Sequence, residues 1–177
     1  KHEVIYLRVF DAIKAKVTNF VISKKKFDRI LSFTFMEDDN MIVFSAIRNG
    51  QSDIFEYRLK RGQVNQITDD AYDDLDPIYV SGGSRKGIAF ISNRTEPFID
   101  IKPLPNELPI GKMKGYFYNT TTKSMELLAL TPNEKGDVSQ IVPYGQDHFA
   151  FLTNENGVVN RNIVNFKRDG KFHLFFC

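Results

Sequence analysis

The sequence contains little cysteine, no tryptophan and no long apolar run. Its only cysteine is Cys177, the last of 177 residues, so neither an internal disulfide nor a cluster of thiolate metal ligands can form. No run of about 18 apolar residues is present, which excludes a membrane-spanning helix in this segment. Helical periodicity is weak, and only residues 11–16 and 27–31 are candidates for single helical turns. The remaining signal is that of β-structure.

The charge is too evenly balanced for a dedicated nucleic-acid binder. Lys and Arg total 24 and Asp and Glu total 22, which gives a formal net charge of +2 rather than a concentrated basic face. A hydrophobic content of 42% excludes a disordered tail. The chain begins at Lys1 rather than at Met and ends inside a predicted strand. We therefore expect it to be an excerpt from a longer protein.

The sequence consists mainly of short apolar segments separated by turn residues. The chain contains 16 Phe and 7 Tyr, residues that favour the pleated, half-buried surface of a strand. Pairs such as Asn49-Gly50, Arg61-Gly62 and Asn156-Gly157 mark tight turns between these segments. Closely spaced short strands predict an all-β sandwich, barrel or propeller.

A repeat decides among these three architectures. The segment that begins at Ile42 (IVFSAIR) matches the one that begins at Ile88 (IAFISNR), and a third copy begins at Phe149 (FAFLTN). Each copy has the length and the four short strands of one propeller blade. We expect the repeated apolar side chains to be among the most buried; these are Ile42, Phe44, Ile88, Phe90, Phe149 and Phe151.

The predicted fold is therefore an all-β β-propeller of four-stranded antiparallel blades, about three and a half of them in an incomplete ring. The predicted blades are residues 31–68, 77–131 and 139–177, and residues 1–30 supply outer strands of a preceding blade. The second blade carries a proline-rich insertion, 95–114, which we expect to project because proline cannot pair in a central strand. Propellers rarely close with fewer than four blades, so the remainder of the same propeller is an expected partner.

Four segments resemble the WD40-like repeat of TolB-type β-propellers. They are Ser52–Tyr57, Gln66–Asp70, Asp74–Pro77 and Gly87–Arg94. The residues of these segments resemble those of the large TolB-like envelope proteins of Bacteroidetes-type bacteria. This resemblance implies a scaffold for protein–protein interaction located in the periplasm or at the outer membrane. The Ser-Pro-Asp-Gly turn of the family is absent, since Glu37–Asn40 and Ser81–Ser84 stand in its place.

The densest charge feature is an acidic run that enters the second blade. Asp73, Asp74 and Asp76 are candidates for a weak cation site, because hard cations take several converging oxygen ligands. The alternative is a structural role, since Asp side chains cap turns by accepting backbone N–H bonds. The three histidines show no metal-ligand spacing, and Gly82–Gly87 lacks both a phosphate-loop ending and a nucleophile elbow. The sequence therefore predicts no catalytic residue, no cofactor and no resident metal.

The insertion carries the candidate partner-binding residues. Apolar side chains on a projecting loop either fold back on the blade or meet a partner. The residues in question are Phe98, Ile99, Ile101, Leu104, Leu108 and Ile110. We expect a non-catalytic scaffold that binds proteins. The alternatives are a propeller domain that gates substrate for a tricorn-like or prolyl-oligopeptidase-like peptidase, and a propeller that binds a glycan or small ligand with the insertion as a lid.

Overall fold

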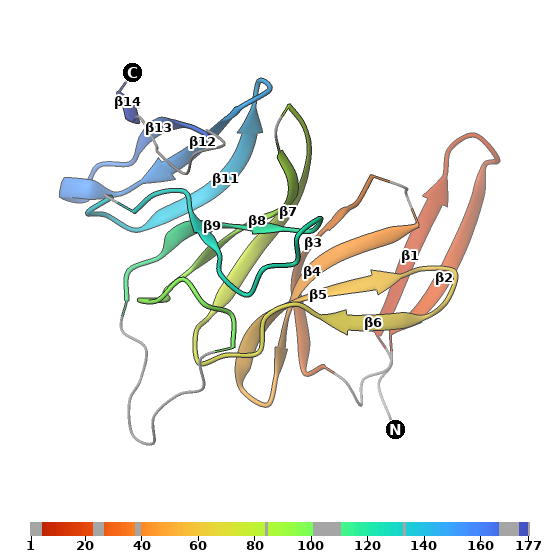
Figure 1. Ribbon diagram of the computed structural model, residues 1–177. Helices are drawn as coiled ribbons and strands as arrows, with labels where there is room; N and C mark the ends of the chain where they lie inside the picture. The colour runs from red at the N-terminus through yellow and green to blue at the C-terminus, as the bar shows by residue number, and fades with distance from the viewer. Residues whose placement is uncertain are drawn as a thin grey trace.

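The computed structural model describes residues 5–22, 27–37, 40–83, 85–100, 111–132 and 134–166, together with the backbone of 174–176. In this part of the chain the regular structure is β throughout, except for one short 3-10 turn, η1 (Glu155–Gly157). The strands form four antiparallel sheets that lie side by side in chain order (Figure 1). The predicted all-β propeller architecture is confirmed.

Three of the sheets are four-stranded meanders, which we call blades one, two and three. Blade one contains β3 (Arg29–Phe35), β4 (Met41–Arg48), β5 (Gln51–Arg58) and β6 (Gln63–Gln66). Blade two contains β7 (Asp74–Gly82), β8 (Arg85–Ser92), β9 (Lys114–Asn119) and β10 (Leu128–Ala129). Blade three contains β11 (Val138–Tyr144), β12 (His148–Thr153), β13 (Asn160–Asn165) and β14 (Leu174–Phe176). In each blade the strands lie side by side in sequence order, and the first strand forms one edge.

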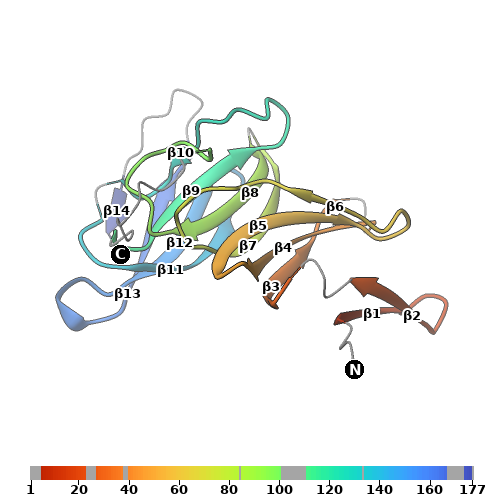
Figure 2. The same ribbon diagram turned by 90° about the horizontal axis from the view of Figure 1, so that it is seen from below.

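The fourth sheet is a two-stranded hairpin of β1 (Ile5–Asp11) and β2 (Lys16–Ile22). It lies beside blade one, on the side away from blade two (Figures 1 and 2). The helical turn expected at 11–16 is wrong, because the Asp11 carboxylate accepts the backbone N–H groups of Ile13 and Lys14 and closes a hairpin turn. The helical turn expected at 27–31 is also wrong, since β3 begins at Arg29.

The first strand of each blade is bulged. The pairing register shifts between Leu75 and Ile78 in β7 and between Ser139 and Val142 in β11. The bulges hold Asp76 and Gln140 at φ values of 50° and 52°, the left-handed region that is costly for residues other than glycine. In β3 the register shifts between Ile30 and Ser32. These bulges disrupt the ladder at the free edge of each blade.

The core consists of three apolar layers between successive sheets. The six repeated side chains predicted to be buried are all 0–1% exposed, which confirms that prediction. Successive side chains of β4 point to opposite faces of the sheet, so the strand contributes to two layers. Ile42 and Phe44 face the β1–β2 hairpin, while Val43 faces blade two. The third layer joins blades two and three around Phe117, Phe149 and Phe166. Each blade is therefore stabilised mainly by its neighbours.

Candidate functional site

The proline-rich insertion begins as a segment folded back along the outer edge of blade two. The backbone N–H of Ile99 donates to the carbonyl of Met125 at 3.1 Å, and that of Leu127 donates to the carbonyl of Pro97 at 2.6 Å. The Ile99 carbonyl also accepts the N–H of Asp69, at 3.3 Å, from the connection between β6 and β7. Main-chain bonds therefore fix the start of the insertion between blades one and two.

The six predicted partner-binding residues fall into three groups. Ile99 is 4% exposed and belongs to the apolar layer between blades one and two, so its side chain is core rather than surface. Phe98 is 41% exposed and stands at the surface beside it. The remaining four lie outside the described residues; these are Ile101, Leu104, Leu108 and Ile110. The described start of the insertion thus both folds back on the blade and presents one aromatic ring.

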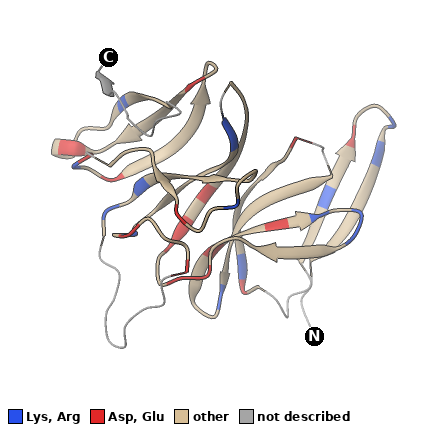
Figure 3. Cartoon of the chain, viewed as in Figure 1, with Lys and Arg blue, Asp and Glu red and all other residues tan. Residues whose placement is uncertain are grey.

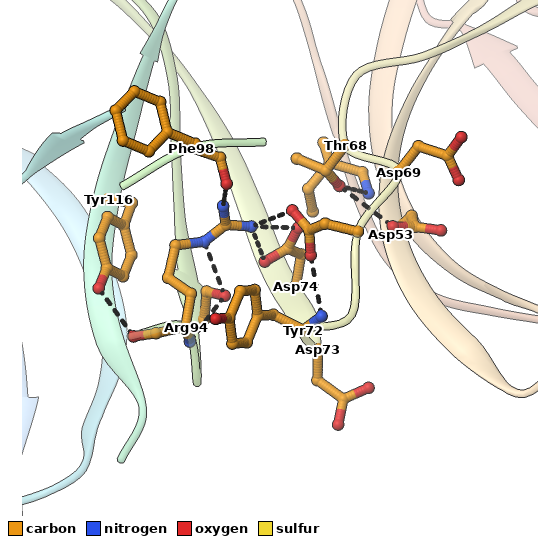
Figure 4. A network of polar contacts seen from close by, with 12 residues as sticks. Asp53, Thr68, Asp69, Tyr72, Asp73, Asp74, Arg94, Phe98 and Tyr116 are labelled. Carbon is orange, nitrogen blue, oxygen red and sulfur yellow. Dashed lines mark hydrogen bonds and ion pairs between the residues drawn. The ribbon is translucent and has the colours of Figure 1, made fainter. Parts of the chain in front are cut away.

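A buried ion pair lies directly beneath this segment (Figure 4). Nη2 of Arg94, at the end of β8, is 2.8 Å from both carboxylate oxygens of Asp74 and 2.9 Å from Oδ2 of Asp70. The three side chains are fully buried. Nε of Arg94 donates to Oγ of Ser92 at 3.0 Å, and Nη1 donates to the carbonyl of Phe98 at 2.8 Å. Arg94 therefore connects the entry of β7, the end of β8 and the insertion.

Aromatic rings enclose the guanidinium. The Arg94 Cζ atom lies 5.5 Å from the ring centres of Tyr72 and Tyr116 and 5.7 Å from that of Phe90. The Tyr116 hydroxyl donates to the Arg94 carbonyl at 3.1 Å, and the Tyr72 hydroxyl is bonded to Oγ1 of Thr95 at 2.9 Å. Rings in these positions attract the cation and exclude water, which strengthens the ion pair. We call Arg94, Asp70, Asp74, Ser92 and the three rings the Arg94 cluster.

The cluster holds more negative than positive charge. Burial raises the pKa of Asp70 to about 6, with a further contribution from the Asp74 carboxylate, although Arg94 opposes the shift. Burial and the neighbouring carboxylates of Asp74, Asp70 and Asp69 raise the pKa of Asp53, on β5, to about 7. Burial lowers the pKa of Arg94, but Asp74 and Asp70 outweigh it, so the guanidinium stays charged.

The structure does not bring together the three carboxylates considered as a weak cation site. Asp74 is ion-paired with Arg94, and Asp73 accepts a hydrogen bond from the Ser52 hydroxyl at 2.7 Å. Asp76 is the exposed residue of the β7 bulge. Among the described residues, no group of three or more His, Cys, Asp or Glu side chains is placed to hold a metal ion. Acidic residues instead line the connection that leads into β7 (Figure 3), where Asp70 closes a turn by accepting the N–H of Tyr72.

Sequence reasoning missed Arg94 as the organiser of this region. Arg94 occupies the last position of the repeated segment, where the first copy has Arg48 and the third has Glu155, so the repeat alone gives it no special role. The available signal was an arginine directly after a predicted buried strand, close in sequence to five aspartates. In the structure the Arg94 guanidinium bonds to Ser92, to Asp70 and Asp74, and to the carbonyl of Phe98, so it anchors the insertion to the entry of β7.

Comparison with known proteins gives the class of the fold. No family model and no curated protein matches the sequence. Among solved structures, TolB from Acinetobacter baumannii superimposes with a TM-score of 0.59 at 18% identity, covering 98% of this chain and 40% of that one. Hydrazine synthase from Kuenenia stuttgartiensis gives a TM-score of 0.62 at 12% identity, covering 96% and 27%.

These likenesses define the chain as a β-propeller domain. Its sheets have the arrangement found in a segment of TolB, and the identities are in the range that shows a shared fold alone. The chain spans less than half the length of each of these two proteins. Within the residues that the structure describes, no helix has the length and apolar character needed to cross a membrane.

Proposed function

We propose that this chain is part of a non-catalytic β-propeller scaffold that binds a protein partner in a bacterial cell envelope. The observation that carries the proposal is the bond from Arg94 to the Phe98 carbonyl, which fixes the backbone of an exposed aromatic residue. The envelope location rests on the resemblance of the repeats to those of TolB-type propellers. The partner contacts the start of the insertion, with Phe98 at the centre of the contact.

Anchoring favours binding because it removes an entropic cost. A loop that must be ordered on association loses affinity for each residue it immobilises, whereas Phe98 already stands on a fixed backbone. Aromatic side chains frequently carry a large part of the binding energy at interfaces. Phe98 therefore has the residue type and the rigidity of an interface anchor.

The surroundings of Phe98 indicate the character of the partner. Asp69, Glu96 and Asp100 are exposed on the same two connections. Exposed acidic residues on the segments that carry an aromatic ring are complementary to an apolar pocket bordered by Lys or Arg. We therefore expect association to weaken as the salt concentration rises, because exposed charges are screened.

A photo-crosslinking amino acid placed at position 98 tests this proposal in cells that make the full-length protein. We expect position 98 to capture one partner, with capture reduced when unlabelled protein competes. The matched control is the same photoreactive group at Tyr144, an exposed aromatic residue at the end of β11. Equal capture at 98 and 144, or capture that ignores the competitor, would contradict the proposed contact.

A substitution at the same position measures the energy of the contact. With the captured partner purified, we expect Phe98→Ala to weaken binding by about tenfold or more, as removal of an interface anchor does. The melting temperature should stay close to that of the natural protein, because the Phe98 ring is exposed. Unchanged affinity would show that Phe98 is not the anchor.

A further inference from the structure

The free edge of β1 differs from the free edges of the three blades in the described part of the chain. β1 pairs with β2 over seven consecutive residues without a register shift, from Ile5 opposite Ile22 to Asp11 opposite Lys16. The first strands of the three blades are bulged, and the last strands of blades one and two contain four and two residues. Bulges and shortness are the usual protections of an edge. β1 has neither, so it has the form of an interior strand.

Both faces of the β1–β2 hairpin carry apolar side chains. Ile5, Leu7 and Phe20 pack against the core of blade one. The opposite face presents two exposed apolar pairs, Tyr6 opposite Val21 and Phe10 opposite Val17. Between them lies one polar pair, in which Nε of Arg8 donates to Oδ1 of Asn19 at 3.1 Å. A hairpin that faced solvent on one side would alternate apolar with polar residues. This hairpin has the composition of strands that lie between two blades.

Blade one is covered only in part on the side that faces the hairpin. The hairpin lies over the outer strands, where the Tyr57 hydroxyl donates to the Val21 carbonyl at 3.4 Å. Phe33 and Phe35 on β3 pair with Phe44 and Ile42 and so share their face, yet they are 52% and 40% exposed. The structure therefore leaves the inner half of this face open.

A cavity marks the same position. Its volume is about 130 Å³, and its walls come from β1 and β2 on one side and from β3 and β4 on the other. Leu7 and Ile22 line the first wall, and Ile30, Phe33 and Phe44 line the second. The cavity has apolar walls, and the unprotected edge of β1 lies beside it. Further strands could pair with this edge and pack on these walls.

We propose that a β-hairpin of the same polypeptide, preceding β1, fills this position. Its second strand pairs antiparallel with the free edge of β1, and both of its strands pack on Phe33 and Phe35. β1 and β2 then become the outer half of a four-stranded blade. This inference does not depend on the proposed partner contact at Phe98.

The order of strands within the chain argues for that source. In blades one, two and three the strands follow one another from the bulged edge outwards, and after blades one and two the chain enters the bulged edge of the next blade. The hairpin leads into β3 in the same way as β6 leads into β7 and β10 leads into β11. The two strands that the hairpin lacks are therefore those that come before it. Successive side chains of each missing strand point to opposite faces of the sheet. We expect apolar residues on both faces, one set packing on blade one and the other on the next blade on the far side.

Thiol labelling of the full-length natural protein tests the proposal. In a Cys177→Ser background, Phe33→Cys reports on the open half of blade one, and Ile13→Cys is the control because Ile13 is 97% exposed in the hairpin turn. We expect a maleimide to label position 33 about 100-fold or more slowly than position 13, as for a site that reacts only on local opening. Deleting the residues that precede position 1 should bring the two rates within about tenfold, since the 52% exposed side chain is then free.

Each other outcome overturns the proposal. Fast labelling of position 33 in the monomeric full-length protein would show that the position is open. Protection that survives the deletion, or that rises with protein concentration, would assign the position to another segment or to a second copy of the chain. A natural polypeptide without residues before position 1 would also refute it.

Hydrogen exchange of the protein without substitutions tests the same pairing if the Phe33→Cys variant fails to fold. The β1 amides that are not bonded to β2 should exchange slowly in the full-length protein and rapidly after the deletion. Equal exchange in the two forms would contradict the predicted pairing.

Discussion

The junction between blades one and two has different central residues from the junction between blades two and three. Both junctions contain the same set of hydrogen bonds from backbone N–H groups to side chains, which we call the frame. In each frame a threonine hydroxyl accepts a backbone N–H at 2.9 Å, Thr68 from Ile54 and Thr131 from Gly115. An asparagine amide oxygen likewise accepts an aspartate N–H in each, Asn93 from Asp73 at 2.8 Å and Asn154 from Asp137 at 2.7 Å. These short polar bonds recur with the repeat.

The centres of the two junctions differ. The first contains the buried Arg94 ion pair, whereas the second contains the aromatic cluster of Phe117, Phe149 and Phe166. The residue that corresponds to Arg94 in blade three is Glu155, whose nearest cation, on Lys135, is 3.9 Å away at the surface. Only blade two of the three has a long insertion after its second strand. The charged centre therefore accompanies the insertion that it anchors, whereas blades two and three are joined through apolar and aromatic packing.

Replacement of Arg94 should have the largest effect on this comparison. Arg94→Met leaves Asp70 and Asp74 buried without a counter-charge, so we expect a loss of about 3–5 kcal/mol in the free energy of unfolding, measured by urea denaturation. The control is Glu155→Gln at the corresponding position of blade three, expected to change stability by less than about 0.5 kcal/mol. Similar losses for the two variants would mean that the junctions do not differ as described.

Acidity should affect the first junction more than the second. The pKa of Asp53 is raised to about 7, so folding favours its protonated form. The stability contribution of this protonation is complete below about pH 4 and is lost as the pH rises through 7, by an amount on the order of 3 kcal/mol. Asp53→Asn should therefore be more stable than the natural protein at pH 8 and about equally stable at pH 4. Parallel stability curves for the two proteins from pH 4 to 8 would contradict the raised pKa.

Gly115 tests the close approach of blades two and three. A Cβ atom at this position would overlap Cδ1 of Ile141 on β11. We expect Gly115→Val to cost about 1–3 kcal/mol, the range for overpacking a core, in thermal unfolding measurements. The double variant with Ile141→Ala should recover part of the loss, because it removes the overlapping atom. No recovery would show that the cost arises within β9 rather than between the blades.

The shared frame predicts equal effects at its two threonines. Thr68→Val and Thr131→Val each remove the acceptor of one buried N–H while keeping the shape of the side chain. Thr68→Val also removes a long hydrogen bond to Asp53, at 3.5 Å. We expect each to lower stability by about 1 kcal/mol, measured by urea denaturation. A much larger loss at one position would show that the two junctions differ in the frame as well as in the centre.

The repeated features could be predicted from the sequence, and the features found only once could not. Phe44, Phe90 and Phe151 recur at matched positions, so the period identified both the blades and their core. Asp70, Asp74 and Arg94 come together only when the entry of β7 lies against the end of β8, and the sequence gives no sign that these charges are buried. The sequence left open whether Ile99 folds back on the blade or meets a partner, because its contacts with the outer edge of blade two depend on tertiary folding.

The bonds that anchor the insertion have a consequence for its evolution and for engineering. Arg94 binds the Phe98 carbonyl, and the neighbouring ladder uses only the main-chain groups of Pro97, Ile99 and their partners. Because the peptide groups are common to all residues except for the missing N–H of proline, the exposed side chain at position 98 is free to vary without loss of the anchor. A library of substitutions at that position should therefore yield variants with altered selectivity and unchanged fold. Under the proposed function, the side chain at position 98 would select the partner while main-chain bonds maintain the scaffold.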